Sequence, residues 1–322
     1  MNPPSKDGTP QGSGTPGGVK VPARPPANPV GEARLRVGCP VWAHADWRGR
    51  FFTAEARRED FLPQYASVFG AAEANPTFYG LPAAATVARW AEEAPEDFRF
   101  CFKFPRTITH ERRLSGAGRE TEEFLGRLAP LGERLGPFFL QLHASFGAAQ
   151  LGALMAYLAG LPRDFSYAVE VRAPEFFAGS AEERDLDALL VDQGVDRVNF
   201  DTRGLFASIA TDEFTADARR KKPRVPLRTT VTGKRPFVRF VGDPELPRNG
   251  ALLDAWAVVV AGWLRSGLSP YFFTHHPDDT EAPALARDFQ RRIHAICPAA
   301  GAPQVWPVER GSAGTVRQLD LF

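Results

Sequence analysis

The side chains of this chain that could do chemistry follow short apolar segments. Candidate catalytic groups are the carboxylates of Glu73, Glu170 and Asp201, which can act as general bases, and the imidazole of His110. Candidate substrate-binding groups are the polar side chains of Asn75, Tyr79, Lys103, Arg106, Gln141, Arg172, Arg239 and His275. Guanidinium groups bind phosphate and carboxylate oxygens through a planar fork of donors. Arginines beside carboxylates therefore predict an anionic substrate, such as a phosphoester or a carboxylated sugar.

Several of these groups are also metal-ligand types. His143, Glu170, Asp201 and His275 carry the donor atoms that divalent ions accept. The chain lacks HExxH and any similarly tight ligand spacing. The cofactor is therefore unknown from sequence, and a bound divalent metal stays an open alternative.

Each polar residue also has a structural explanation. A charge at a strand end can pair with a neighbouring strand, so Glu170 could form a salt bridge with Arg172 or Lys103. Buried charges cost several kcal/mol unless they are paired or used. About a dozen ionisable groups near the ends of apolar segments favour a polar ligand site over packing alone.

These residues need a scaffold that brings distant segments together. Strand-like segments cover 35–42, 68–79, 98–105, 137–146, 167–177, 197–201, 237–242 and 270–276. Helical patterns alternate with them near 54–66, 83–94, 120–134, 148–160, 181–193, 250–266 and 281–296. This alternation predicts an α/β fold, a single (β/α)8 TIM barrel over residues 34–298, whose carboxyl strand ends share one functional face. The alternative is an open doubly wound sheet, but GCPVWAH after the first strand lacks its glycine-rich turn.

One connection departs from this alternation. Residues 202–236 are punctuated by proline and glycine and include the basic run ARRKKPRVP at 218–226. The punctuation leaves room for only a short helix. We expect a long loop on the rim of the functional face.

Both ends of the sequence differ from this pattern. Residues 1–33 are rich in proline, glycine and serine, which predicts a disordered tail. Residues 299–322 form an extended C-terminal tail that ends in QLDLF, namely Gln318, Leu319, Asp320, Leu321 and Phe322. This pentapeptide resembles the segment by which bacterial repair and replication proteins bind the sliding clamp. The alternative is that the same apolar groups strap the tail onto its own barrel.

Bulk composition restricts the setting. The formal net charge of +1 argues against a globally basic nucleic-acid coat, although it permits a local basic site. Cys39, Cys101 and Cys297 are far apart and lack CxxC spacing, so disulfides and structural zinc are not expected. No long apolar stretch predicts a membrane span, and no signal peptide is apparent. These features predict a cytoplasmic protein.

The sequence resembles the domain-of-unknown-function 72 family, also called YecE-like. The resemblance is carried by VGCPVW at 37–42, FLPQYASVFGAAEANPTFYGLP at 61–82, FKFP at 102–105 with ITH at 108–110, AVEVR at 168–172 and FVRFVG at 237–242. It implies a barrel like those of endonuclease IV and sugar isomerases, without an established reaction. Glu73, Asn75, Tyr79, Lys103, His110, Gln141, Glu170, Arg172, Asp201 and Arg239 match the family's polar positions. Ala173 and Val241 stand where the family has histidines, which puts a shared substrate in doubt.

These observations lead to one leading function and two alternatives. The leading hypothesis is an enzyme on nucleic acid or another phosphoester, brought to DNA by the clamp-like tail. The second is a small-molecule enzyme on an anionic sugar or metabolite. The third is a non-catalytic binding module tethered to the clamp.

Overall fold

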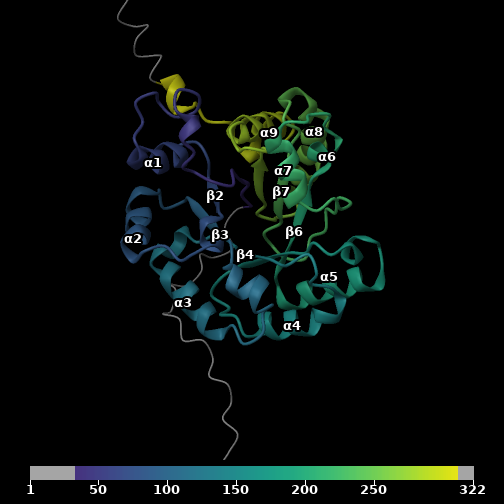
Figure 1. Ribbon diagram of the computed structural model, residues 1–322. Coiled ribbons are helices and arrows are strands. Elements are labelled where there is room, and N and C mark those ends of the chain that lie inside the picture. Colours follow the sequence, from purple (N-terminus) through teal and green to yellow (C-terminus); the bar gives the residue numbers. More distant parts are fainter. Residues whose placement is uncertain (1–32, 311–322) are drawn as a thin grey trace, which may run out of the picture.

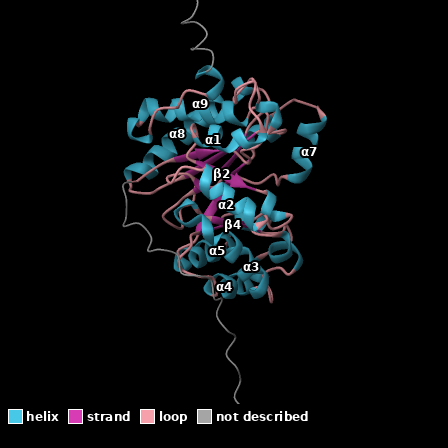
Figure 2. Ribbon diagram, turned by 90° about the vertical axis from the view of Figure 1, so that its left-hand side faces the viewer, coloured by secondary structure: helices cyan, strands magenta, loops and turns pink. Residues whose placement is uncertain are grey.

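A computed structural model of the chain describes residues 33–310. The N-terminal tail, apart from residue 33, and the QLDLF peptide lie outside the described residues. Within 33–310 the strands are short and occupy the middle of the molecule, with helices around them (Figure 2). The strands are β1 Arg36–Gly38, β2 Ala71–Ala74, β3 Arg99–Phe102, β4 Phe138–Gln141, β5 Tyr167–Glu170, β6 Asp196–Asp201, β7 Phe237–Val241 and β8 Tyr271–His275.

The helices alternate with these strands along the chain (Figure 1). They are α1 Phe61–Ala66, α2 Ala84–Glu93, α3 Gly118–Leu128, α4 Leu151–Ala159, α5 Ala181–Gln193, α6 Arg203–Ala207, α7 Glu213–Lys221, α8 Gly250–Arg265 and α9 Ala282–Ile296. Local signals fix the helix ends. In α5 the Ser180 hydroxyl accepts the Glu183 N–H, and Gly194 ends the helix at a φ of 63°, which glycine adopts without a steric penalty.

The expectation of a closed eight-stranded barrel is wrong. The strands form a six-stranded parallel sheet in the order β1-β8-β7-β6-β5-β4 and a separate two-stranded sheet of β2 and β3. Every ladder is parallel, as alternation with helices requires. The architecture is therefore a half-barrel sheet with a small second sheet beside it.

The two sheets adjoin along seams that carry no ladder. Between β1 and β2 the Tyr65 hydroxyl accepts the Cys39 N–H at 2.7 Å and donates to the Ala71 carbonyl at 2.9 Å. A side chain thus occupies backbone groups that direct strand pairing would have used. Between β3 and β4 only single bridges form, at Phe100 with Leu135 and Lys103 with Phe139. The apolar patterns of these strands do not predict that the ladders are missing between β1 and β2 and between β3 and β4.

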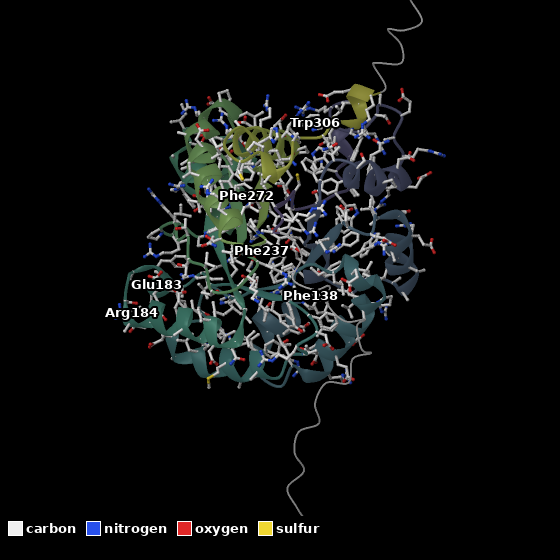
Figure 3. The ribbon with its side chains drawn as sticks, turned by 180° about the vertical axis from the view of Figure 1, so that it is seen from behind. Phe138, Glu183, Arg184, Phe237, Phe272 and Trp306 are labelled. Carbon is white, nitrogen blue, oxygen red and sulfur yellow. The ribbon has the colours of Figure 1, made fainter. Side chains whose placement is uncertain are left out.

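Alternation along the strands separates two apolar regions. Phe139 points to the inside of the sheets, where it lies 5.4 Å from the ring of Phe237. Its neighbour Phe138 points outward and packs on Phe124 of α3 at 5.5 Å. Phe272 likewise faces α9, where it stacks on Phe289 at 3.7 Å (Figure 3). Period-2 burial on both faces explains why the strands are nearly continuous apolar runs.

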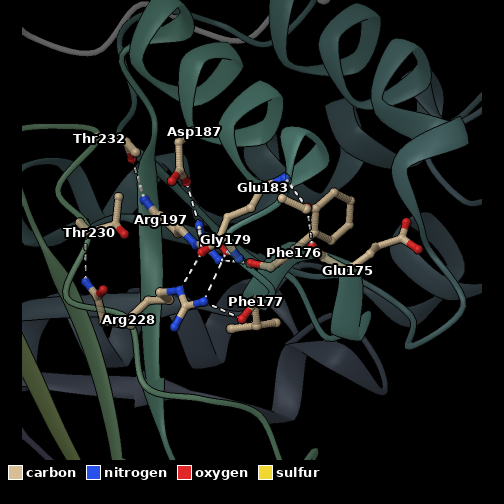
Figure 4. Close-up of polar contacts among 12 residues, drawn as sticks. Glu175, Phe176, Phe177, Gly179, Glu183, Asp187, Arg197, Arg228, Thr230 and Thr232 are labelled. Atoms are coloured by element: carbon tan, nitrogen blue, oxygen red, sulfur yellow. Dashed lines mark hydrogen bonds and ion pairs between the residues drawn. The ribbon is translucent and has the colours of Figure 1, made fainter.

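The long connection 202–236 is more ordered than expected. It contains both α6 and α7, and the α7 N-cap Asp212 accepts the Thr215 N–H at 2.9 Å. A partly buried group of ion pairs anchors the second half of this connection (Figure 4). We call this group the clasp; it consists of Glu183, Asp187, Arg197 and Arg228. Glu183 receives the Arg228 guanidinium at 2.6 Å and the Gly179 N–H at 2.7 Å. The clasp therefore joins the connection to the start of α5.

The structure bears on two expectations from composition, which concern the cysteines and membrane-spanning segments. Cys39, Cys101 and Cys297 are unpaired and buried, and burial raises the pKa of Cys101, which keeps that thiol protonated. Among residues 33–310 no helix combines the length and apolar character needed to cross a bilayer.

Candidate functional site

The same alternation that fills the interior also creates a layer of polar groups. Ala71, Cys101, Phe139, Ala168, Phe237 and Phe273 belong to one buried interior group. Two residues further along each strand, the inward positions become Glu73, Lys103, Gln141, Glu170, Arg239 and His275. Residues two apart on a strand share a face, so this polar layer sits directly above the apolar one. We call these six residues with Arg172 the ionic cluster.

Arg239 of β7 lies at the centre of the ionic cluster. Its guanidinium donates from Nε and Nη2 to the two Glu73 oxygens at 2.8 and 2.7 Å, and from Nη1 to Glu170 Oε2. Arg239 also lies over the rings of Phe139 and Phe200, with its Cζ 5.4 and 5.3 Å from their centroids. A bidentate fork between two carboxylates in a buried setting holds both carboxylates in fixed positions.

A second set of contacts joins Arg172, Gln141 and Lys103. Arg172 donates from Nε to Glu170 Oε1 at 2.7 Å and from Nη2 to Gln141 Oε1 at 2.7 Å. Lys103 Nζ donates to the same Gln141 oxygen at 2.9 Å and lies 3.7 Å from the centroid of the Phe78 ring. One amide oxygen therefore receives two cationic donors, and neither donor is fully neutralised by it.

Glu73 has further neighbours at the β1 and β8 side. Asn75 Nδ2 donates to Glu73 Oε1 at 2.8 Å and to the Pro40 carbonyl at 3.1 Å. His275 Nε2 lies 3.2 Å from Glu73 Oε2, whereas the adjacent His276 faces Asp278 on the other side of the strand. Asn75 thus ties the carboxylate to the segment that follows β1.

The electrostatics of the cluster follow from these contacts. Burial disfavours charged Glu73, but the charge of Arg239 and the hydrogen bond from His275 outweigh it and hold the Glu73 pKa well below its usual range. For Glu170 burial is likewise overcome by Arg239 and Arg172, giving a pKa of about 2. Burial and the Arg239 charge lower the pKa of Lys103 to about 7. Both carboxylates are therefore ionised, while Lys103 is the group that titrates near neutral pH.

Imidazoles lie at the edge of the site. His110 contacts the Phe78 ring edge-on at 5.0 Å and the His143 ring at 5.4 Å. Its Nδ1 lies 2.9 Å from the Thr109 hydroxyl. Burial and the nearby Lys103 charge lower the pKa of His110 to about 4, so its ring is neutral at physiological pH. A neutral imidazole beside Lys103 can accept or donate one hydrogen bond to a ligand.

The structure does not bring every predicted residue into the cluster. Asp201 is buried on the other face of β6, where it accepts the Trp256 indole N–H at 2.8 Å and pairs with Arg203 at 2.8 Å. Tyr79 is 85% exposed, and exposed Arg106 pairs with Glu111 at 3.7 Å. The strand-end pattern placed Asp201 near the site, but the face it occupies depends on a register that the sequence did not fix.

The candidate metal ligands are also separated. His143 contacts Ser145 at 2.8 Å, Glu170 is held by two arginines, and Asp201 faces α8. Within the described part of the chain, no group of three or more histidine, cysteine, aspartate or glutamate side chains is arranged to hold a metal ion.

Two residues were missed by reasoning from strand ends. Phe78 supplies the ring beneath Lys103, and Lys222 follows α7 on the long connection. Burial lowers the pKa of Lys222, and the charges of Arg239 and Arg172 lower it further. Lys222 therefore interacts electrostatically with the ionic cluster. Arg172 Nη1 also donates to the Lys221 carbonyl at 3.1 Å, which joins this segment to the site. The basic run in the predicted rim loop was the available signal.

Comparison with known proteins places the chain in a family. Residues 36–306 match the model described as "Protein of unknown function DUF72". The chain belongs to the DUF72 family. This DUF72 chain is 39% identical to the UPF0759 protein YecE of Escherichia coli K12 over 273 residues, 85% of this chain and 97% of that protein. The resemblance found in the sequence is therefore confirmed.

Solved structures of the family share the fold of this DUF72 chain. A DUF72 family protein from Enterococcus faecalis V583 aligns with a TM-score of 0.61 and 19% identity, covering 81% of this chain and 97% of that chain. One from Thermotoga maritima MSB8 aligns with a TM-score of 0.62 and 20% identity, covering 81% and 99%. These likenesses support the fold.

Proposed function

We propose that the ionic cluster binds an anionic, phosphate-containing substrate of an enzyme. The observation that carries this proposal is an excess of positive charge in a buried place. Lys103, Arg172 and Arg239 can supply three positive charges, whereas Glu73 and Glu170 supply two negative ones. Burial lowers the His275 pKa, so His275 adds no charge at neutral pH. A bound anion would balance the remaining charge, which in a desolvated site is a favourable interaction.

The proposed roles follow from which groups remain available. Arg239 is occupied by both carboxylates, so it and they form a fixed base for the site. Lys103 and Arg172 share the Gln141 oxygen, and Arg172 also donates to Glu170 and the Lys221 carbonyl. The N–H groups of both that remain without an acceptor can turn toward phosphate oxygens. Lys103, with a pKa of about 7, can also donate a proton to a leaving oxygen. Glu73 and Glu170, being strongly stabilised as anions, are weak bases.

Anion titration by isothermal calorimetry tests this proposal. Methyl phosphate and sulfate are titrated into the full chain and into Arg172→Gln and Lys103→Met. Each substitution should weaken binding about tenfold, the effect of losing one charge-assisted hydrogen bond. Arg163→Gln is the matched control, because Arg163 is bound to Gln193 at the opposite strand ends and should leave affinity unchanged. Equal affinity in all four proteins would contradict the proposal.

The leading substrate class is nucleic acid, with the clamp-like tail bringing the chain to DNA in the cytoplasm. Binding to a short duplex should weaken steeply with added salt, because each phosphate contact releases counterions. A salt-independent interaction would contradict nucleic-acid binding.

Attachment to a bacterial sliding clamp is tested by fluorescence anisotropy with labelled clamp. The double variant Leu321→Ala, Phe322→Ala should abolish the rise in anisotropy that binding produces.

A small anionic sugar or metabolite is the second candidate. It is favoured by the depth of the cluster, in which Lys103, Gln141 and Arg239 are only 8%, 6% and 5% exposed. Groups this deep are reached more easily by a terminal phosphate or carboxylate than by a continuous backbone. If methyl phosphate binds and duplex DNA does not compete with it, this second candidate is the better one.

A further inference from the structure

A cavity separate from the ionic cluster lies on the outer surface between α1 and α2. Its volume is about 650 Å³, and none of the ionic-cluster residues lines it. Phe61 of α1, Trp90 of α2 and Trp42 after β1 form its apolar walls. The two indole rings meet edge to face at 5.2 Å. A cavity of this size with aromatic walls fits two or three apolar side chains.

The rim of this cavity carries two arginines and two glutamates, of which Arg58 is the one without a partner among the described residues. Arg89 pairs with Glu93 at 3.5 Å, and Glu59 pairs with Arg57 at 3.4 Å. Exposed Arg58 also lines the cavity, and among residues 33–310 its guanidinium group has no hydrogen-bond or ion-pair partner. The best-matched occupant is therefore an apolar segment that carries a negative charge between its apolar side chains.

The chain itself leads toward this place. The last described residues lie beside α1, where the Val308 N–H donates to the Phe51 carbonyl at 3.2 Å (Figure 1). Arg310 Nη1 donates at 3.4 Å to the hydroxyl of Ser67, the residue directly after α1. The six residues of α1 span only about 9 Å to the cavity at its other end. Extended backbone from position 310 to position 318 reaches about 26 Å, so the next residues can enter the cavity.

We propose that the segment Gln318–Phe322 docks in this cavity. In an extended segment alternate side chains share a face, so Leu319 and Leu321 can pack in the cavity against Trp42 and Trp90 while Asp320 faces the rim. Asp320 then pairs with Arg58. A docked segment cannot bind a second protein, so the cavity controls the fraction of chains whose peptide is available to a partner.

Photo-crosslinking of the full chain tests the proposal. p-Benzoylphenylalanine replaces Leu321, the dilute protein is irradiated, and the products are located by peptide mass spectrometry. The expected products are intramolecular links to the peptides that contain Trp42 or Trp90. Links between two chains, links to another surface of the same chain, or no links at all would overturn the proposal.

Charge exchange makes the test specific. Arg58→Glu or Asp320→Lys alone should lower the cavity crosslink yield about threefold, the effect of losing one exposed ion pair. The double variant should restore the yield, because the pair is reformed with reversed charges. Arg163→Glu is the control and should change nothing. Failure of the double variant to recover would show that Asp320 does not face Arg58.

The result is independent of the proposed function. No anion, nucleic acid or clamp is present in the crosslinking experiment, and Arg58 makes no contact with the ionic cluster. Failed docking would therefore leave anion binding unaffected, and failed anion binding would leave docking unaffected.

Discussion

Arg239 determines whether the ionic cluster can exist at all. Its guanidinium is the shared partner of Glu73 and Glu170, both of which are fully buried. Arg239→Met should cost about 3–5 kcal/mol of unfolding free energy, because removal of one partner leaves buried charges unpaired. Urea denaturation measures this loss. Replacing Glu73 and Glu170 with glutamine in the same chain should recover part of it, and a triple variant no more stable than Arg239→Met would contradict the argument.

Acid sensitivity follows from the same residues. The folded pKa of Glu170, about 2, lies below its unfolded value near 4.5. A carboxylate with a lowered pKa stabilises the fold fully above its unfolded pKa, and this stability is lost as the pH falls from about 4.5 to 2. Unfolding free energy of the native chain should therefore fall across this window. Glu170→Gln is expected to flatten that fall, and an unchanged pH dependence in this variant would contradict it.

Lys103 should make anion binding depend on pH. Its folded pKa is about 7, and an anion binds the protonated amine better than the neutral one. Sulfate affinity should therefore be highest below pH 7 and fall by up to tenfold per pH unit above it. Sulfate stays a dianion over this range, so only the protonation of the amine changes. Lys103→Met should bind more weakly and without this dependence; a similar slope in the variant would assign the titration to another group.

At the scale of elements, the clasp holds the long connection against α5. Glu183 is the acceptor for both Arg197 and Arg228, at 3.3 and 2.6 Å. Glu183→Gln should cost about 3 kcal/mol and increase amide hydrogen exchange over 222–232, since half-buried Arg228 loses its charge partner and buried Arg197 keeps only Asp187. The neighbouring exposed Arg184 provides the control, where Arg184→Gln should change stability by less than about 0.5 kcal/mol (Figure 3). Equal exchange in both variants would show that the clasp does not hold the connection against α5.

Sequence patterns could predict the elements but not how all of them pair. Apolar runs and helical spacing depend on local residue order, and the eight strands lie within or beside the predicted segments. The seam at Tyr65 depends on one hydroxyl that meets two backbone groups distant in sequence, and no local pattern reports such a contact. The same reason applies to the site. Glu73 and Arg239 converge because period 2 repeats from strand to strand, whereas Lys222 reaches the site through the fold of a loop.

At the scale of the whole molecule, Trp306 connects the parts on either side of the β1–β2 seam. Its ring lies 4.7 Å from Arg287 Cζ of α9 and 5.3 Å from the ring of Phe51, which packs near α1. Glu309 reinforces this link by pairing with Arg287. Because the seam lacks a ladder, side-chain packing must hold the two-stranded sheet in place.

Trp306→Ala should therefore loosen one side of the molecule more than the other. The half-buried indole contributes about 1–2 kcal/mol of unfolding free energy through its apolar area. Hydrogen exchange should rise in β2 and β3 and stay nearly constant in β5, β6 and β7, whose ladders are continuous. Val305→Ala is the control, since Val305 is 53% exposed. A uniform rise in exchange across all strands would mean that the seam is no weaker than a ladder and that the two sheets unfold as one unit.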